Sequence, residues 1–411
     1  MKRFDTNTRL MLMVMALAST GGAITALIFN LYIHALGYRQ DFIGLLNGLP
    51  AVVVLVVGLP LGIAADRRGY LGFMRVGAVL SVASGLGLAL ARPPALLVGF
   101  SLLGGLGGAL TWVIAAPLMM VISRPEDRLH LFAISSAIGL SVGFLGSLLG
   151  GALPRLYGGW WGLAAGDVEP LRASLLTAVA LSALAIGPLL GMREPRSRPP
   201  GAARPLPRNW GEAKLFLKLL GPSALVATGA GAMVVFFQLF FRLRFGLEPG
   251  TIGVLFAFAS VTTAVATLVS PGLARRFGRV RAVVCTELAS IPFLLVLAYS
   301  YDLRWVVLAY YFRQALMNMS GPVRHVFLLE QVREDQRATF SSLAEILGGL
   351  GRGGLGPIIS GFLQVRGGFS AAFTLTSACY VVGAALFYAF FRGAERPPVA
   401  GDSVPGIEAA T

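Results

Sequence analysis

Among the charged residues inside long apolar stretches of the sequence, four are candidates for chemistry, because a charge is costly to bury there. They are Glu287, Arg313, Glu345 and Arg352. A carboxyl group in such a place responds to burial and to a neighbouring arginine, so it can bind and release a proton. We therefore expect a proton-coupling site with Glu345 as the first candidate and Glu287 as the second, and structural ion pairing is the alternative. Glu345 and Arg352 are seven residues apart, which places them on one face of a helix.

Side-chain amides in the same apolar stretches predict a cavity that binds a ligand. Asn30 and Gln238 occupy matching positions in two similar segments, FNLYIHALG (29–37) and FQLFFRLRFG (237–246). A polar residue there either faces a cavity or makes hydrogen bonds between helices, and both interpretations stay open for this pair. The other candidates for the cavity wall are Arg313, Asn318, Trp112 and Tyr310. For the two aromatic residues, packing in a core is the alternative.

The composition excludes several classes of protein. Of the 411 residues, 56% are hydrophobic and 13% are charged, and the mean hydropathy is +0.75. So few charges cannot cover a surface that faces water, which makes lipid the expected solvent. The net charge of +15 comes from arginines between apolar stretches, and no nucleic-acid-binding motif accompanies it. The sequence also lacks a metal-binding pattern, an ATP-binding loop and a nucleophile–base pair, so we expect neither an enzyme nor a bound cofactor.

The candidate residues must be positioned by helices long enough to cross a bilayer, about 17–25 residues each. An unpaired backbone in hydrocarbon is so costly that every crossing stretch must be helical. Twelve stretches qualify: about 10–36, 41–65, 74–91, 95–122, 129–153, 171–192, 215–241, 250–274, 280–300, 303–328, 338–364 and 369–391. Basic residues are about three times as frequent in loops on the side of the N-terminus as in the other loops, which predicts that both termini are cytoplasmic.

The two halves of the chain repeat each other. Three further pairs of segments align in order: FIGLL (42–46) with TIGVL (251–255), AADRRGYLG (64–72) with LARRFGRVR (273–281), and EDRLHLFAISS (126–136) with EDQRATFSS (334–342). Such a series indicates a duplicated six-helix unit. We expect an all-α membrane protein with twelve transmembrane helices in two pseudo-symmetric six-helix bundles, 1–192 and 215–392. A basic cytoplasmic linker (193–214) joins them, and a tail (393–411) is expected to be disordered.

The turn between the second and third apolar stretches carries a family motif. In GIAADRRG (62–69), Gly62, Ala65, Asp66, Arg67 and Gly69 match the pattern Gly-x-Leu-Ala-Asp-Arg-x-Gly-Arg-Lys. Together with the twelve stretches and the basic central loop, this motif resembles that of the major facilitator superfamily. A second segment, GSLLGG (146–151), resembles the Gly-Pro-x-x-Gly-Gly signature of the drug-antiporter branch, with Ser147 in place of proline.

The resemblance implies a secondary transporter that works by alternating access. In the family the aspartate of the motif holds the two halves together on the cytoplasmic side, and Asp66 matches it. The predicted conformational latch consists of Gly62, Asp66, Arg67, Gly69, Glu126 and Asp127, the last two as ion-pair partners of the arginine. A tight, solvated turn is the alternative explanation for the acid and the glycine at its end. The second copy has Arg275 in place of the acid, so the latch is expected in one half.

We expect proton-coupled export of amphipathic drug-like or lipid-like compounds, because an apolar cavity and traces of the antiporter signatures favour it. The altered signatures leave uptake or uniport of a small metabolite open, and a non-transporting receptor or scaffold on the same fold is the alternative from another class. The expected partners are a small-molecule or lipid substrate and the bilayer, without nucleic acid, for a monomer in the bacterial inner (cytoplasmic) membrane. The proton gradient takes the place of a cofactor.

Overall fold

The computed structural model describes residues 5–123, 127–193 and 210–393, and almost all of them are helical. The first half contains α1 (Thr6–Ala35), α2 (Gln40–Arg68), α3 (Tyr70–Leu90), α4 (Pro94–Ile122), α5 (Arg128–Trp161), α6 (Val168–Leu184) and α7 (Ile186–Gly191). The second half contains α8 (Trp210–Val234), α9 (Phe237–Phe245), α10 (Pro249–Phe277), α11 (Arg279–Ala289), α12 (Ile291–Tyr299), α13 (Leu303–Glu330), α14 (Arg337–Gly349) and α15 (Gly356–Phe391). A short 3-10 turn (Glu334–Gln336) precedes α14, and a π-helical segment (Leu350–Leu355) joins α14 to α15.

Within the described residues these helices make twelve crossings, six in each half, and the predicted fold class is confirmed. Ten helical stretches are long and apolar enough to cross a membrane. One of them, Thr339–Phe391, contains two crossings, because the backbone leaves the helical conformation at Gly368, where φ is 65°. The remaining crossing is α13, whose hydropathy is lowered by its polar residues. Most of the predicted linker and nearly all of the predicted tail lie outside the described residues.

Besides the eleventh crossing with its π-helical segment, three described crossings are broken at one or two residues, which their sequences did not predict. The sixth breaks at Ala185, the seventh at Val235 and Phe236, and the ninth at Ser290. In the ninth, Pro292 stands at the start of α12 and has no backbone N–H for a hydrogen bond to the preceding turn, which explains the break.

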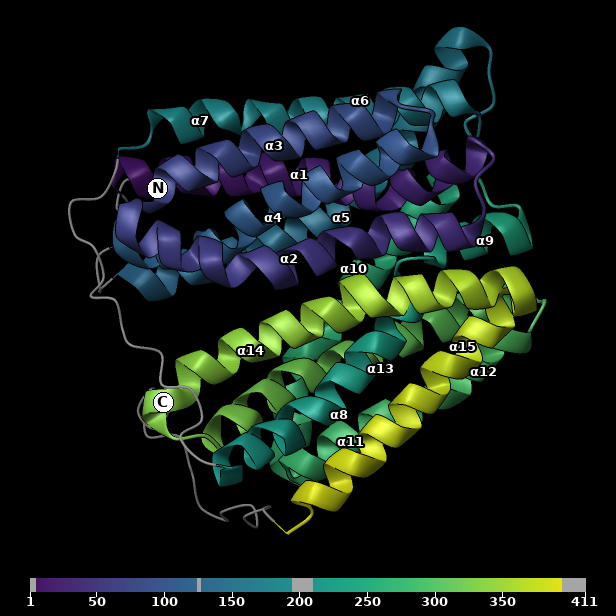
Figure 1. The fold of residues 1–411 in the computed structure, drawn as a ribbon. Coiled ribbons are helices and arrows are strands. Elements are labelled where there is room, and N and C mark those ends of the chain that lie inside the picture. Colours follow the sequence, from purple (N-terminus) through teal and green to yellow (C-terminus); the bar gives the residue numbers. More distant parts are fainter. Residues whose placement is uncertain (1–4, 124–126, 194–209, 394–411) are drawn as a thin grey trace, which may run out of the picture.

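The crossings form two bundles that meet at one end (Figure 1). In this view the bundles approach each other on the right, near α9 and the start of α15, and diverge to the left. We call the left end, which carries the start of α1 and the turns from α2 to α3 and from α10 to α11, the basic end, and we call the other end the opposite end. The two turns are equivalent in the two halves, with φ of 102° at Gly69 and 83° at Gly278. Glycine adopts these angles at little cost, so the turn itself requires the last residue of the ADRRG motif.

Candidate functional site

Two helix crossings join the halves near the opposite end, and glycine makes both possible. A Cβ atom added to Gly44 of α2 would overlap the carbonyl oxygen of Pro357 and lie 3.2 Å from the Cα of Gly361 in α15. A Cβ atom added to Gly253 of α10 would lie 2.8 Å from the Cα of Gly151 in α5. Backbones this close require small residues on both helices. The glycines of α2 and α10 stand at matching positions of the repeat, so the two crossings are related by pseudo-symmetry.

Two side-chain amides also join the halves, and each donates to the backbone of the other half. Asn30 of α1 donates through Nδ2 to the carbonyl oxygen of Val235 at 2.5 Å, and Gln238 of α9 donates through Nε2 to the carbonyl oxygen of Ala26 at 3.1 Å. Asn47 donates to Oδ1 of Asn30 at 2.8 Å, which orients the Asn30 amide. Asn30 is 1% exposed and Gln238 is 3% exposed. Of the two interpretations left open by the sequence, hydrogen bonding between helices is the one formed in this conformation, and a place for these amides in a ligand cavity stays a prediction.

Arg313 is buried in the second half without a carboxylate partner among the described residues. Its Nη2 donates to the hydroxyl of Tyr380 at 2.6 Å, and its Nη1 donates to Oε1 of Gln314. The guanidinium group lies 5.6 Å from the ring centroid of Phe237 and 5.8 Å from that of Tyr380, within reach of a cation–π interaction. Asn318 donates to the carbonyl oxygen of Gln314 in its own helix and does not contribute to this group.

Glu287 of α11 is paired with Arg324 of α13, not with Arg313 or Arg352 as the sequence suggested. Oε1 of Glu287 accepts a hydrogen bond from Nη2 of Arg324, and the carboxylate side chain is 1% exposed. The sequence analysis missed Arg324, because an arginine near the basic end of a helix looks like an ordinary loop-side charge. Its guanidinium group also lies 5.1 Å from the ring centroid of Phe387.

The expected pairing of Glu345 with Arg352 is not formed. Both side chains are exposed, and no ion pair joins them in the described part of the chain. Seven residues separate the two side chains by about 10 Å along a helix axis, which is too far for a direct ion pair. The π-helical segment Leu350–Leu355, which contains the arginine, also begins between them.

The two aromatic candidates lie in different environments. The Trp112 side chain of α4 is 85% exposed, so it is not packed in a core. Tyr310 is 3% exposed, with ring centroids 4.9 Å from Phe237, 5.4 Å from Phe241 and 5.8 Å from Phe256. Tyr310 therefore packs in the core of the second half in this conformation, which is the alternative that the sequence left open, and its place in a cavity wall stays a prediction.

At the basic end, Asp66 is half-buried and its Oδ1 accepts a hydrogen bond from the hydroxyl of Tyr70 at 2.8 Å. Tyr70 stands where the family motif has a basic residue, so this chain holds the aspartate from within its own half. Arg67 is exposed at the end of α2, and Gly62 lies one turn before the aspartate.

The acids predicted to pair with Arg67 are only partly described. Glu126 lies outside the described residues, and Asp127 is buried at the start of α5. The second half contains a comparable ion pair, since Arg279 after the Gly278 turn pairs with Glu330 at the end of α13. An arginine of this turn can therefore reach an acid that follows the fourth crossing of its own half.

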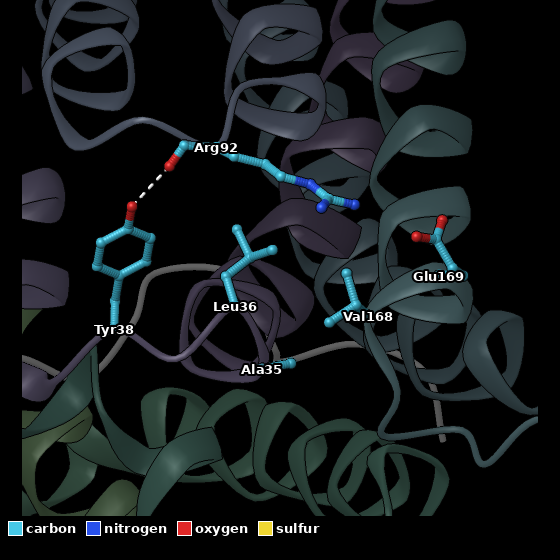
Figure 2. A pocket seen from close by; sticks show the side chains of 6 residues that line it. All are labelled: Ala35, Leu36, Tyr38, Arg92, Val168 and Glu169. Carbon is cyan, nitrogen blue, oxygen red and sulfur yellow. Dashed lines mark hydrogen bonds between the residues drawn. The ribbon is translucent and has the colours of Figure 1, made fainter.

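A separate cavity of about 350 Å³ lies at the opposite end of the first half (Figure 2). Ala35, Leu36 and Val168 give it an apolar wall, while Arg92 and Glu169 extend toward it from two different elements. Glu169 is already paired with Arg172 at 2.8 Å, and all the residues that line the cavity belong to the first half. The cavity is therefore distinct from the charged groups of the second half.

A comparison with protein families decides what this arrangement belongs to. The family model described as Major Facilitator Superfamily matches residues 11–243 and again 220–410. The chain belongs to the Major Facilitator Superfamily. Membership makes it a transporter and not an enzyme, and the two matches reflect its repeated halves. A search of curated proteins found no match.

Solved structures of the superfamily share the fold at low sequence identity. A bacterial homolog of the human lysosomal transporter Spinster, inward-facing and occupied, has a TM-score of 0.78 and 19% identity, covering 94% of this chain and 96% of that one. The nucleoside transporter NupG has a TM-score of 0.73 and 14% identity, covering 94% and 98%. A D-xylose-proton symporter has a TM-score of 0.70 and 15% identity, covering 94% and 97%. At these identities the likeness supports the fold, and it does not support assignment to a drug or lipid efflux branch.

In this superfamily member, the glycine-rich signature segments contribute directly to the contact between the halves. Ser147 and Gly151 of GSLLGG face Gly253. In the second half, Pro357 and Gly361 of a similar segment, GPIISG (356–361), face Gly44. The segments thus serve the same purpose in both halves, whether or not the signature proline is present.

Proposed function

We propose that the protein is a secondary transporter that works by alternating access and exports amphipathic drug-like or lipid-like compounds in exchange for protons. The observation that supports this best is a set of contacts between the two halves near the opposite end. The contacts come in matching pairs, one amide bond and one glycine crossing from each half, and the amides are those of Asn30 and Gln238. We take the basic end as cytoplasmic on the positive-inside rule, so that the described conformation is closed toward the outside. A single chain supplies all of these contacts, which is in keeping with a monomer.

The contacts between the halves are of a kind that can break and form again. Each amide–carbonyl bond contributes about 1 kcal/mol net, because water replaces it when the halves separate. Two such bonds favour the closed end by about 2 kcal/mol, a bias that differential binding of a substrate is able to reverse. The glycine crossings keep the helix backbones smooth where they move against each other.

We propose Glu287 as the principal proton carrier, with the exposed Glu345 as the second candidate. Protonation of Glu287 removes its negative charge and releases Arg324 from their ion pair. Arg324 and Arg313 share α13, so a change at the ion pair reaches the buried charged group of the second half through one helix. This gives proton binding a structural route to the candidate site.

The proposal is tested by flux into and out of proteoliposomes with and without an imposed pH gradient. In wild type, amphipathic compounds of the panel should move in the direction opposite to the protons when a pH gradient is imposed. Glu287→Gln should still exchange substrate across the membrane at equilibrium, but its flux should no longer respond to the gradient. Glu334→Gln, at an 89% exposed carboxylate, is the matched control and should behave as wild type. Glu345→Gln discriminates between the two candidates, since only the true carrier should lose the response.

Three results would contradict parts of this proposal. Wild-type flux that ignores the gradient removes proton coupling and leaves uniport. Accumulation in the same direction as the protons replaces export with uptake. Absence of flux across the panel, with correctly folded protein, favours a receptor or scaffold on the same fold.

A further inference from the structure

The middle of the second half holds more positive than negative charge. Arg313, Arg324 and Arg352 lie on α13 and on the π-helical segment, while Glu287 neutralises only Arg324. Among the described residues, no carboxylate oxygen lies within 4.0 Å of a guanidinium nitrogen of Arg313 or Arg352. Arg313 is buried, and a buried cation without an anionic partner is costly, so this arginine calls for a compensating anion.

Tyr380 lies close to both arginines. Its hydroxyl accepts the hydrogen bond from Arg313 at 2.6 Å. Its ring borders Gly229 of α8, two residues before Gly231, which packs against the backbone of Arg352. Tyr380 is fully buried, and the buried Nε of Arg313 has no hydrogen-bond partner in the described structure. The group is therefore compact, polar and incompletely satisfied.

Arg352 is the member of this group that an external ligand can reach. Its side chain is exposed, although its backbone packs closely against Gly231 of α8. The following residues, Gly353 and Gly354, face Ala51 of α2, so the arginine stands at the junction of the two halves. An exposed guanidinium at this depth must face water and not hydrocarbon, since exposure to lipid would be prohibitive. A π-helical segment is also frequent at functional sites, because it re-aims side chains.

We propose that Arg352 and Arg313 form an anion subsite, and that the transported amphipathic compound carries a carboxylate, sulfonate or phosphate group. Arg352 binds the oxyanion directly, since a guanidinium group matches its geometry with two parallel N–H donors. Arg313, held by Tyr380 and Gln314, keeps the electrostatic potential behind it positive. This inference rests on the proposed transport function and deepens it by naming the charge of the substrate.

The test compares three ligands with the same aromatic body and different charges. Naphthalene-2-sulfonate, 2-naphthalenemethanol and 2-naphthylmethylammonium are titrated by calorimetry into the full chain in uncharged micelles. We expect the sulfonate to bind about tenfold more tightly than the alcohol, and the ammonium compound to bind most weakly. Arg352→Gln should remove the advantage of the sulfonate and leave the affinity for the alcohol unchanged. Arg366→Gln, at an exposed arginine near the other end of the same crossing, should keep the advantage.

Further arms make the outcome unambiguous. Arg352→Lys keeps the charge but not the two parallel donors, so it should retain part of the preference for the sulfonate over the alcohol. Melting curves check that each variant is folded. Phosphatidylglycerol added to the micelles separates two sources of the anion: it abolishes the advantage of the sulfonate if a lipid head group occupies the subsite, and leaves it intact if a soluble anion does.

The proposal is overturned by equal affinities for the three ligands, by preference for the ammonium compound, by absence of sulfonate binding, or by an undiminished preference in Arg352→Gln. These titrations contain no gradient, so their failure is distinct from failure of the transport proposal. Gradient-driven flux of the alcohol without a preference for the sulfonate would overturn this inference alone.

Discussion

Replacing Asn30 by alanine should shift the protein away from the conformation that is closed at the opposite end. The variant loses the bond from Nδ2 of Asn30 to the carbonyl oxygen of Val235, which links the two halves. The bond from Asn47 lies within one half and is present in either conformation, so it does not enter the difference between them.

The size of the shift follows from that single bond. Its net contribution is about 1 kcal/mol, and leaving the Val235 carbonyl unpaired in a buried place raises the cost to about 2 kcal/mol. The ratio of the two conformations should therefore change by a factor of about 5–30. Gln238→Ala should have a similar effect, since its amide makes the reciprocal bond to Ala26.

Distances between spin labels measure the shift. One label pair, at Arg68 and Phe277, reports on the basic end, and a second pair, at Arg39 and Arg304, reports on the opposite end. All four positions are exposed and each pair spans the two halves, so labels in a background without the native cysteines should be tolerated. In Asn30→Ala, shorter distances should gain population at the basic end and longer distances at the opposite end.

The matched control is Asn318→Ala. That amide donates to the Gln314 carbonyl of its own helix at 2.8 Å, so the substitution deletes the same chemical group without touching the contact between the halves. Identical distance distributions in Asn30→Ala and Asn318→Ala, or a shift toward a wider basic end, would refute the reasoning.

Two further predictions address the glycine crossing and the latch. Gly253→Val should push α10 away from Gly151, cost about 1–3 kcal/mol through overpacking and reduce substrate counterflow at least about tenfold. Gly272→Val in the same helix, where a Cβ atom meets nothing within 4 Å among the described residues, should leave counterflow unchanged, and equal loss in both variants would contradict the crossing. Asp66→Asn retains an acceptor for Tyr70, so it should melt within about 2 °C of wild type yet transport poorly. Unchanged transport by this variant would remove Asp66 from any latch.

The fold was predictable because it depends on patterns that extend over many residues. Long apolar stretches leave the backbone no alternative to a helix, and the repeated segments set six crossings in each half. The interruptions at Ala185, Val235 and Ser290 were not predictable to the same degree, since each depends on one or two residues in a particular packing environment.

The candidate site was predictable only in part. The matching positions of Asn30 and Gln238 were visible in the sequence, but their acceptors are backbone carbonyls of the other half, which no residue type marks. Arg324 looked like a loop-side charge, and nothing in the sequence distinguishes Tyr380 from other tyrosines of an apolar helix. Arg352 lies in a π-helical segment, which the regular spacing of the sequence did not predict.

The position of the glycine crossings makes the long helices act as levers with an off-centre fulcrum. α10 crosses α5 at Gly253, near the start of a helix that ends at Phe277. At 1.5 Å per residue, a rotation of about 10° at the crossing moves Phe277 by about 6 Å and Pro249 by about 1 Å. Rotation about this fulcrum thus closes or reopens the basic end and leaves the opposite end almost still. Opening the opposite end requires the helices to separate at the glycine crossing itself. The two ends of this transporter therefore cannot open by the same rotation.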